Sequence, residues 1–258
     1  MTSTETSTDY VQSLARGLSV IRAFDAERPR QTLTDVAKAT GLTRATARRF
    51  LLTLNELGYV RTDGSLFWLT PAVLDLGYSY LSSLSLPEIA GPHLEELSAA
   101  VHESSSVSIL DGGDIVYVAR VPVRRIMAVS ITIGTRFPAT VTSMGRAILA
   151  DQSPADLTRF LADHPLPTLT SHTLASADAL RLELESVRRN GYALVDQELE
   201  AGLRSLAAPI RDRNGTVVAA VNLSTQAGRH SVDEIRTTLV GPLLACAQAI
   251  SDDLARMA

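Results

Sequence analysis

Three arginines lie within six residues of one another, at positions 44, 48 and 49. A guanidinium group is planar and permanently charged, and its paired donors match the geometry of phosphate, of a guanine edge or of a carboxylate. In a helix, Arg48 and Arg49 would lie opposite the apolar residues, with Arg44 at the exposed N-terminal end. This spacing indicates an anion-binding helix face, although the solvated face of a helical hairpin has the same pattern.

The arginines belong to a segment, Thr32 to Val60, that predicts two helices joined by a tight corner. The first helix spans 33–39, and Gly41 forms the corner because it can adopt a left-handed conformation without a Cβ penalty. Thr43 then caps a second helix that continues to about residue 57. A short helix, a glycine corner and a second, basic helix are typical of a helix-turn-helix that binds DNA. The residues predicted to meet DNA are Thr43, Arg44, Ala45, Thr46, Arg48 and Arg49.

Two β-prone runs follow within residues 59–69, and Asp63-Gly64 between them is a strong hairpin signal. An amphipathic helix is predicted before the helix-turn-helix, over residues 11–24. A helix, a helix-turn-helix and a hairpin together make a winged helix, in which Arg61 is the wing residue best placed to meet a phosphate. We therefore predict a winged helix-turn-helix domain over residues 10–70, with double-stranded operator DNA as its partner.

Charge is unevenly distributed along the 258 residues, whose net charge is −4. Residues 1–72 carry nine basic and seven acidic side chains, whereas the remainder carries fifteen and twenty-one. The basic surplus therefore coincides with the predicted DNA-binding segment. No apolar run approaches the roughly 18 residues that cross a bilayer, and residues 1–9 resemble a disordered tail more than an export signal. We expect a cytoplasmic protein with no membrane partner.

Beyond residue 70 the sequence predicts a linker helix and then a second domain. The linker helix spans 71–85 and is apolar on more than one side, so it either packs between the domains or pairs with its copy in a second subunit, and we expect the dimer contact. Residues 86–258 mix β-type runs and helices without βαβ repeats, which predicts an α+β fold with helices on the faces of an antiparallel sheet. Strands are predicted at 105–110, 115–121, 125–133, 192–196, 203–211 and 216–224. Helices are predicted at 87–103, 144–150 with Ser143 as its cap, 154–163, 177–190 and 232–257.

The second domain lacks the usual signatures of catalysis. The five histidines have no metal-ligand spacing, Cys246 is the only cysteine, and no nucleophile elbow, P-loop or dinucleotide fingerprint is present. We therefore expect no catalytic residue, no metal and no cofactor. An enzyme that acts on a ligand of the second domain is one alternative, and a constitutive DNA binder without an effector is another.

Two features indicate a pocket for an organic anion. Arg124 and Arg125 open a predicted strand whose later positions are apolar, so one guanidinium can point inward to hold a carboxylate. The run 142–145 opens a helix, whose free N–H groups also favour anions. Surface ion pairs are the plain alternative for both arginines, and a solvated strand edge is the default interpretation of the alternating carboxylates at 196, 198 and 200.

The segment from Thr32 through the wing resembles the winged-helix domain of the IclR family of bacterial transcription regulators, and the resemblance extends from about Gln12 to Met257. It is carried in the second half by TSMGRAILA (142–150), GYALVDQE (191–198), GLRSLAAPI (202–210) and VAAVNLS (218–224). The stretch 117–147 resembles a subgroup that governs aromatic-acid breakdown through the β-ketoadipate route, exemplified by PcaR, PcaU and PobR.

This resemblance implies an effector-binding domain with a GAF- or profilin-like sheet, and homodimers that often pair into tetramers. Ser205 stands where other members carry cysteine, and Asn222 stands where serine is common, so the resemblance leaves the ligand open. The positions that match the family's effector pocket are Ser143, Met144, Gly145, the strand Asp196–Glu198, Ser205, Asn222 and Ser224.

The sequence thus predicts a regulator whose DNA binding responds to a small aromatic carboxylate such as protocatechuate or 4-hydroxybenzoate, or to β-ketoadipate. Arg125, with Arg124 as second choice, would hold the carboxylate, so Arg125→Ala is expected to weaken the effector response and leave DNA affinity largely intact. Asp196 or Glu198 would accept hydrogen bonds from phenolic hydroxyls. The apolar walls would come from Met144 and from Ile126 or Met127.

Overall fold

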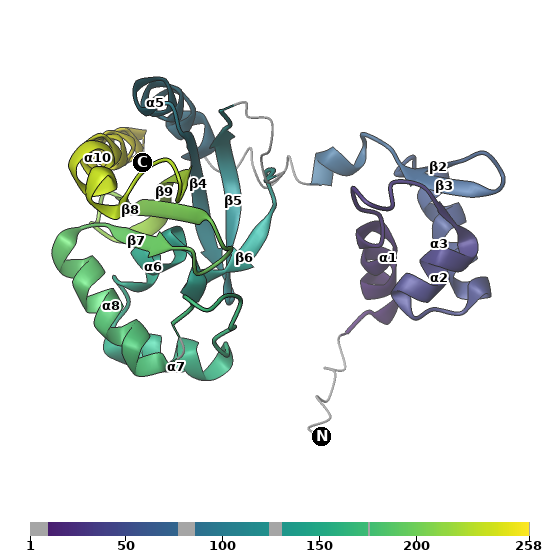
Figure 1. The fold of residues 1–258 in the computed structure, drawn as a ribbon. Helices are drawn as coiled ribbons and strands as arrows, with labels where there is room; N and C mark the ends of the chain where they lie inside the picture. The colour runs from purple at the N-terminus through teal and green to yellow at the C-terminus, as the bar shows by residue number, and fades with distance from the viewer. Residues whose placement is uncertain (1–9, 77–85, 124–130, 175, 258) are drawn as a thin grey trace. The chain divides into compact units, whose positions relative to one another are not determined.

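The computed structural model describes residues 10–76, 86–123, 131–174 and 176–257, and the chain divides into two compact units near residue 83 (Figure 1). The first unit has a three-stranded antiparallel sheet in the order β1-β3-β2. Its elements are α1 (Gln12–Arg22), β1 (Gln31–Thr32), α2 (Leu33–Thr40), α3 (Arg44–Glu56), β2 (Val60–Thr62) and β3 (Leu66–Leu69).

Local capping explains where the two central helices begin and end. Thr32 and Asp35 form a reciprocal capping box at the start of α2, and Gly41 ends that helix with φ = 66°. The Thr43 hydroxyl accepts a hydrogen bond from the Thr46 amide at 3.2 Å and so starts α3. A single apolar core then packs α1, α2 and α3 against the sheet, with Leu51 fully buried at its centre. The predicted helix-turn-helix with its wing is confirmed.

The turn of the wing is closed by one carboxylate. Asp63 accepts hydrogen bonds from the amides of Ser65 and Leu66, at 2.9 and 2.8 Å, and these bonds hold the pKa of Asp63 below its ordinary value. Phe67 packs into the core, and the Trp68 ring lies under the Arg30 guanidinium, 4.5 Å from its centroid. The wing is therefore fixed at its tip and at its base.

The second unit contains a six-stranded sheet in the order β6-β5-β4-β9-β8-β7, in which every neighbouring pair is antiparallel. This confirms the predicted α+β class and the antiparallel sheet. The strands are β4 (Ser104–Asp111), β5 (Asp114–Val121), β6 (Arg136–Pro138), β7 (Ala193–Asp196), β8 (Leu203–Arg211) and β9 (Val217–Gln226).

Helices cover both faces of this sheet, and each face has its own apolar core (Figure 1). One face carries α5 (Leu86–Val101) and α10 (Val240–Met257), which follows α9 (Val232–Glu234) and the π-helical η2 (Ile235–Leu239). The other face carries η1 (Ala139–Val141), α6 (Ser143–Leu149), α7 (Pro154–Asp163) and α8 (Ala177–Asn190). No helix in the described part of the chain is both long enough and apolar enough to span a membrane.

Three predicted elements need correction. Of the strand expected over 125–133, residues 131–133 are not a strand, because Thr132 and Thr135 form a turn that leads into β6; 124–130 lie outside the described residues. The cap of α6 is Thr142 and not Ser143, since the Thr142 hydroxyl accepts from the Gly145 amide at 3.2 Å. The last helix is interrupted by η2. Within the predicted linker helix, 73–76 are helical and 77–85 are not described.

Candidate functional site

The outer face of α3 presents three arginines to solvent. Arg44, Arg48 and Arg49 are exposed, as is Ala45 between them. Among the described residues none places a carboxylate within ion-pair distance of these guanidinium groups. Their charge is therefore not neutralised inside the protein, and the face is suited to a polyanion.

Of the other residues predicted for this interface, Thr43 and Thr46 cap α3, and Arg61 lies on the wing. The hydroxyls of Thr43 and Thr46 lie 2.9 Å apart and share a hydrogen bond, so both are engaged at the start of α3. Arg61 is exposed on β2, directly across the hairpin from Trp68. α3 and the wing thus each supply unpaired positive charge on the same small unit.

The second unit contains a cavity of about 450 Å³, a size typical of small-molecule sites. It lies on the α6 face of the sheet, where α6, Leu169 and the turn 197–203 contribute to its walls. Its apolar lining includes Val123, Ile131, Phe137, Met144, Leu169, Leu199 and Leu203. Its polar lining includes Ser104, Tyr117, Arg120, Thr142, Ser143, Glu200, Ser205, Asn222, Ser224, Thr225 and Gln226.

The register of the sheet arranges the polar residues of the floor in two rows. Ser106 of β4 lies between Arg120 of β5 and Asn222 of β9. Two residues further along β4, Ser104 faces Ser224, which in turn faces Ser205. Because alternate residues of a strand point to the same face, both rows project toward α6. The floor is therefore rich in hydrogen-bonding groups, whereas the walls are mostly apolar.

Arg120 is the one cationic side chain among the described residues that line this cavity. It is half-buried, it donates to the Ser106 hydroxyl at 3.1 Å, and no carboxylate of the described residues pairs with it. Burial lowers the pKa of Arg120, because the charged form loses solvation. A guanidinium in this position is well suited to bind a carboxylate that enters the cavity.

Tyr117 lies beside Arg120 and is buried. Burial raises the pKa of its phenol to about 12, so the hydroxyl is protonated and can donate a hydrogen bond at neutral pH. Its ring meets the Phe137 ring edge to face, with the centroids 6.0 Å apart. The two rings form an aromatic wall next to the guanidinium.

A β-bulge brings Tyr117 and Arg120 to the same face. Strict alternation would place side chains three residues apart on opposite faces. The pairing of β4 with β5 shifts between Val107 and Ser108, so Val118 and Ala119 both pack on the α5 side and Arg120 turns back to the cavity. The prediction missed both cavity residues for this reason, since the sequence around them contains no glycine or other sign of a bulge.

The structure brings five of the predicted effector residues to this cavity: Ser143, Met144, Ser205, Asn222 and Ser224. Gly145 does not line it and instead allows α6 to pack on η1, because a Cβ at this position would lie 2.1 Å from the Ala139 carbonyl oxygen. Arg124, Arg125, Ile126 and Met127 lie outside the described residues. The cap made by Thr142 already engages the amide of Gly145, so the start of α6 offers fewer free donors than expected.

Two predicted acceptors, Asp196 and Glu198, do not line the cavity. Arg204 binds the Asp196 carboxylate with Nε at 2.7 Å, and this contact holds the pKa of Asp196 below its ordinary value. Glu198 forms a buried ion pair with Arg146, with a closest distance of 2.6 Å. Both carboxylates are thus occupied by arginines of their own domain, and the geometry does not support their predicted contact with phenolic hydroxyls.

A winged helix with an unpaired basic face, followed by a domain with a mostly apolar cavity, defines a ligand-responsive DNA-binding regulator. Residues 13–64 match the IclR helix-turn-helix domain, and residues 78–252 match the bacterial transcriptional regulator IclR C-terminal domain. The chain belongs to the IclR family of transcription regulators. Since this family and the relatives named below regulate transcription, the enzyme alternative is set aside.

Individual relatives agree with this assignment. The chain is 41% identical over 247 residues to the Pca regulon regulatory protein of Pseudomonas putida, covering 95% of this chain and 85% of the relative. The crystal structure of a transcriptional regulator from Rhodococcus sp. RHA1 is 61% identical in sequence to this chain, with a TM-score of 0.89. The alignment covers 96% of this chain and 100% of that structure. An IclR homologue of Microbacterium hydrocarbonoxydans, solved in complex with 4-hydroxybenzoate, is 26% identical to this chain with a TM-score of 0.84. The alignment covers 96% of this chain and 100% of the homologue.

Proposed function

We propose that this regulator binds a small aromatic carboxylate in the cavity of its second unit, and that this binding changes its affinity for operator DNA. The observation that carries the proposal is Arg120, a half-buried guanidinium without a carboxylate partner among the described residues, in a cavity with mostly apolar walls. A carboxylate would complete its ion pair, and a ring would fill the space beside Tyr117 and Met144. The 4-hydroxybenzoate complex of a structural relative supports the same class of ligand.

Asn222 offers a way to recognise a ring hydroxyl. Its amide nitrogen donates to the Ser224 hydroxyl at 3.1 Å, whereas its carbonyl oxygen is buried without a partner among the described residues. A buried acceptor without a donor is costly, so a ligand that supplies an O–H there gains affinity. Asn222 stands two strands from Arg120 in the same row, about 10 Å away at the usual strand spacing. This separation favours a hydroxyl on the side of the ring opposite the carboxylate.

The proposal is tested by titrating the protein with 4-hydroxybenzoate, protocatechuate, benzoate, β-ketoadipate and methyl 4-hydroxybenzoate. Binding is followed by the shift in melting temperature and by its effect on a DNA probe that the protein itself selects from a random duplex library. We expect the hydroxylated acids to bind, benzoate to bind more weakly, and the uncharged ester to bind least. Equal binding of the acid and its ester, or no binding by any of them, would contradict the proposal.

Variants assign the contacts. Arg120→Gln should weaken 4-hydroxybenzoate binding most, and Asn222→Leu should abolish the preference for 4-hydroxybenzoate over benzoate. Arg125→Ala and Arg124→Ala belong in the same series, because both residues remain candidate carboxylate ligands from the sequence. If Arg120→Gln binds like the wild type while Arg125→Ala does not, the carboxylate is held by Arg125.

The residues proposed to contact DNA are Arg44, Arg48 and Arg49 of α3 and Arg61 of the wing, supported by Ala45 on the same face and by the capping pair Thr43 and Thr46. Their exposure and unpaired charge support contacts to phosphates and to guanine edges. Since the proposed partner is genomic DNA, we place the protein in the cytoplasm. Activation and repression both remain compatible with this interface.

We also propose that the regulator acts as a homodimer. α1 and its N-cap residue carry an exposed apolar stripe at Val11, Leu14 and Leu18, whose exposed fractions are 60%, 64% and 47%. Exposed apolar side chains at this helical spacing favour pairing with a second copy, and a dimer would contact two DNA half-sites. Sedimentation of the Leu14→Glu/Leu18→Glu variant should show a smaller species than the wild type. A control variant, Leu182→Glu on α8, is expected to sediment like the wild type.

A further inference from the structure

A buried ion pair joins Arg146 of α6 to Glu198. The side chains of Arg146 and Glu198 are only 1% and 9% exposed. Nη1 of Arg146 donates to Oε1 of Glu198 at 2.7 Å, and Nη2 donates to Oε2 at 2.6 Å, so the two groups are joined by parallel bonds. Losing either charge would leave the other buried without compensation, so the two side chains are held firmly in place.

The pair also binds the backbone of two further segments. Nε of Arg146 donates to the Thr140 carbonyl of η1 at 2.9 Å. The Leu174 amide donates to Oε2 of Glu198 at 3.0 Å. One ion pair therefore connects η1, α6, the segment 169–174 and the turn 197–203.

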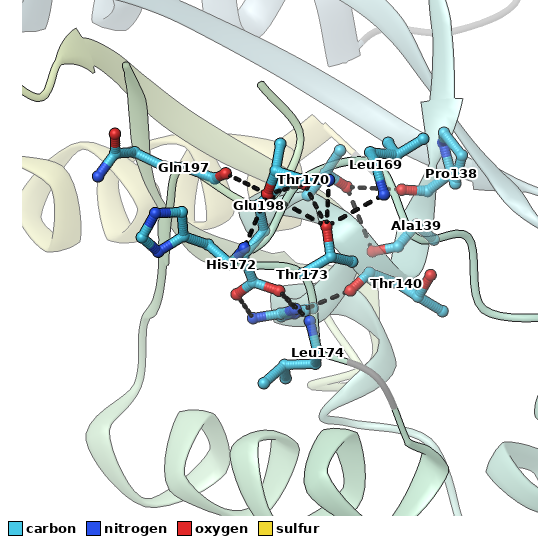
Figure 2. A network of polar contacts seen from close by, with 12 residues as sticks. Pro138, Ala139, Thr140, Leu169, Thr170, His172, Thr173, Leu174, Gln197 and Glu198 are labelled. Atoms are coloured by element: carbon cyan, nitrogen blue, oxygen red, sulfur yellow. Dashed lines mark hydrogen bonds and ion pairs between the residues drawn. The ribbon is translucent and has the colours of Figure 1, made fainter. Parts of the chain in front are cut away.

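The hydroxyl of Thr173 extends this network across the segment 169–174 (Figure 2). It accepts from the amides of Leu169 and Thr170, at 3.2 and 3.0 Å, and it donates to the Glu198 carbonyl at 2.8 Å. The Thr170 hydroxyl donates to the Gln197 carbonyl at 2.7 Å. The segment is thus held against the turn 197–203 by two side-chain hydroxyls.

The turn itself is closed at both ends. Gln197 adopts φ = 60°, its amide donates to the Leu203 carbonyl at 2.8 Å, and its side-chain oxygen accepts from the Gly202 amide at 3.0 Å. A left-handed conformation at a non-glycine residue persists only where its surroundings hold it. The turn 197–203 is therefore internally rigid, so fixing Glu198 fixes the position of the whole turn.

Three of the segments that the network joins, namely α6, 169–174 and 197–203, supply part of the cavity lining, whereas η1 and the network residues Arg146, Thr173 and Glu198 do not line it. The lining side chains of these three segments are Ser143, Met144, Leu169, Leu199, Glu200 and Leu203, and the lining residues Pro138 and Thr142 flank η1. We infer that Arg146, Glu198 and Thr173 are positioning residues for the effector: they hold three wall segments at the separation that a bound aromatic acid requires. This inference rests on the proposed function.

Thr173 offers the sharpest test, because two conservative variants separate its hydroxyl from its methyl group. Thr173→Val keeps the shape and removes the hydrogen bonds, whereas Thr173→Ser keeps the hydroxyl. We expect Thr173→Val to weaken 4-hydroxybenzoate binding by about tenfold and Thr173→Ser to bind nearly like the wild type. Hydrogen exchange at the amides of 169, 170 and 174 should accelerate in the valine variant only. All measurements are made at a temperature at which each variant is fully folded.

Ser98→Ala is the matched control, since Ser98 is a buried hydroxyl on α5, across the sheet from the cavity, bonded to Ser105 at 2.8 Å. It should lower stability without changing ligand affinity. Unchanged affinity in Thr173→Val, or an equal loss in Ser98→Ala, would overturn the inference. If the wild type binds none of the acids, the proposed function fails instead. In that case the amide exchange rates alone test whether the Thr173 hydroxyl holds the segment 169–174 in place. Unchanged exchange rates in Thr173→Val would overturn the inference.

Discussion

The two units of this regulator use arginine in opposite ways. In the first unit, Arg44, Arg48, Arg49 and Arg61 are exposed and lack carboxylate partners among the described residues. In the second unit most of the described arginines pair with a carboxylate: Arg136, Arg146 and Arg211 bind one that is distant in sequence, and Arg204 binds Asp196 of the neighbouring strand.

Arg120 stands out in the second unit because it is half-buried and yet lacks such a partner in the described residues. The unpaired guanidinium groups of α3 and the wing, and that of Arg120, therefore lie at the two places where we expect a partner of negative charge. The exposed groups suit a long polyanion in solvent, whereas the half-buried Arg120 suits a single carboxylate in a cavity with mostly apolar walls. The following predictions test this division, from the largest effect to the smallest.

Removing the unpaired charge of α3 should abolish DNA binding. We expect the Arg44→Ala/Arg48→Ala/Arg49→Ala variant to lose about 10³-fold or more in affinity, since each base or phosphate contact contributes separately. Affinity is measured by fluorescence anisotropy against the selected duplex at several salt concentrations. Its 4-hydroxybenzoate affinity should be that of the wild type, and a loss of both would contradict the division.

Removing a paired, buried arginine should instead destabilise the second unit. Arg146→Ala leaves Glu198 buried without its partner, so the free energy of unfolding is expected to fall by about 3–5 kcal/mol. Urea denaturation followed by circular dichroism measures it. Arg159→Ala, which breaks an exposed ion pair with Asp156, serves as the comparison and should change stability little.

Removing the wing arginine should moderately weaken DNA affinity and leave acid affinity unchanged. Arg61→Ala is expected to weaken binding about 3- to 10-fold and to reduce the salt dependence of log K by about one phosphate contact. The same salt titration measures both quantities. An unchanged slope would remove Arg61 from the interface and leave α3 as the only contact.

The smallest effect is expected at Asp196, whose pKa is lowered mainly by Arg204. Because the folded-state value lies below the unfolded one, this pair stabilises the protein above the unfolded pKa and is lost as pH falls through the folded pKa. Asp196→Asn should therefore flatten the acid side of the stability curve without changing 4-hydroxybenzoate affinity at neutral pH. Melting temperatures between pH 3 and 7 provide the measurement, and a steeper acid limb in the variant would contradict it.

The first unit could be predicted closely from sequence because its signals are local. Thr43, Gly41 and the Asp63-Gly64 turn each act within a few residues, and the helices and hairpin form where those residues place them. The strands and most helices of the second unit followed from similar patterns.

The candidate cavity could be predicted only in part, because its decisive contacts are not local. Arg120 reaches the cavity through a bulge set by pairing with β4, which periodicity along β5 does not show. Glu198, one of two carboxylates predicted from the family resemblance to meet the ligand, instead pairs with Arg146, which lies 52 positions earlier in the chain and which no local pattern indicates. A carboxylate with no neighbour in sequence can still be fully paired in the fold.

The most direct test of the central claim measures two affinities on two variants. Arg120→Gln and Arg48→Ala are each titrated with 4-hydroxybenzoate and, separately, with the selected duplex in the absence of acid. We predict that Arg120→Gln loses about 10- to 100-fold in acid affinity and keeps its DNA affinity, while Arg48→Ala shows the reverse. Full acid affinity in Arg120→Gln, or full DNA affinity in Arg48→Ala, would contradict the account.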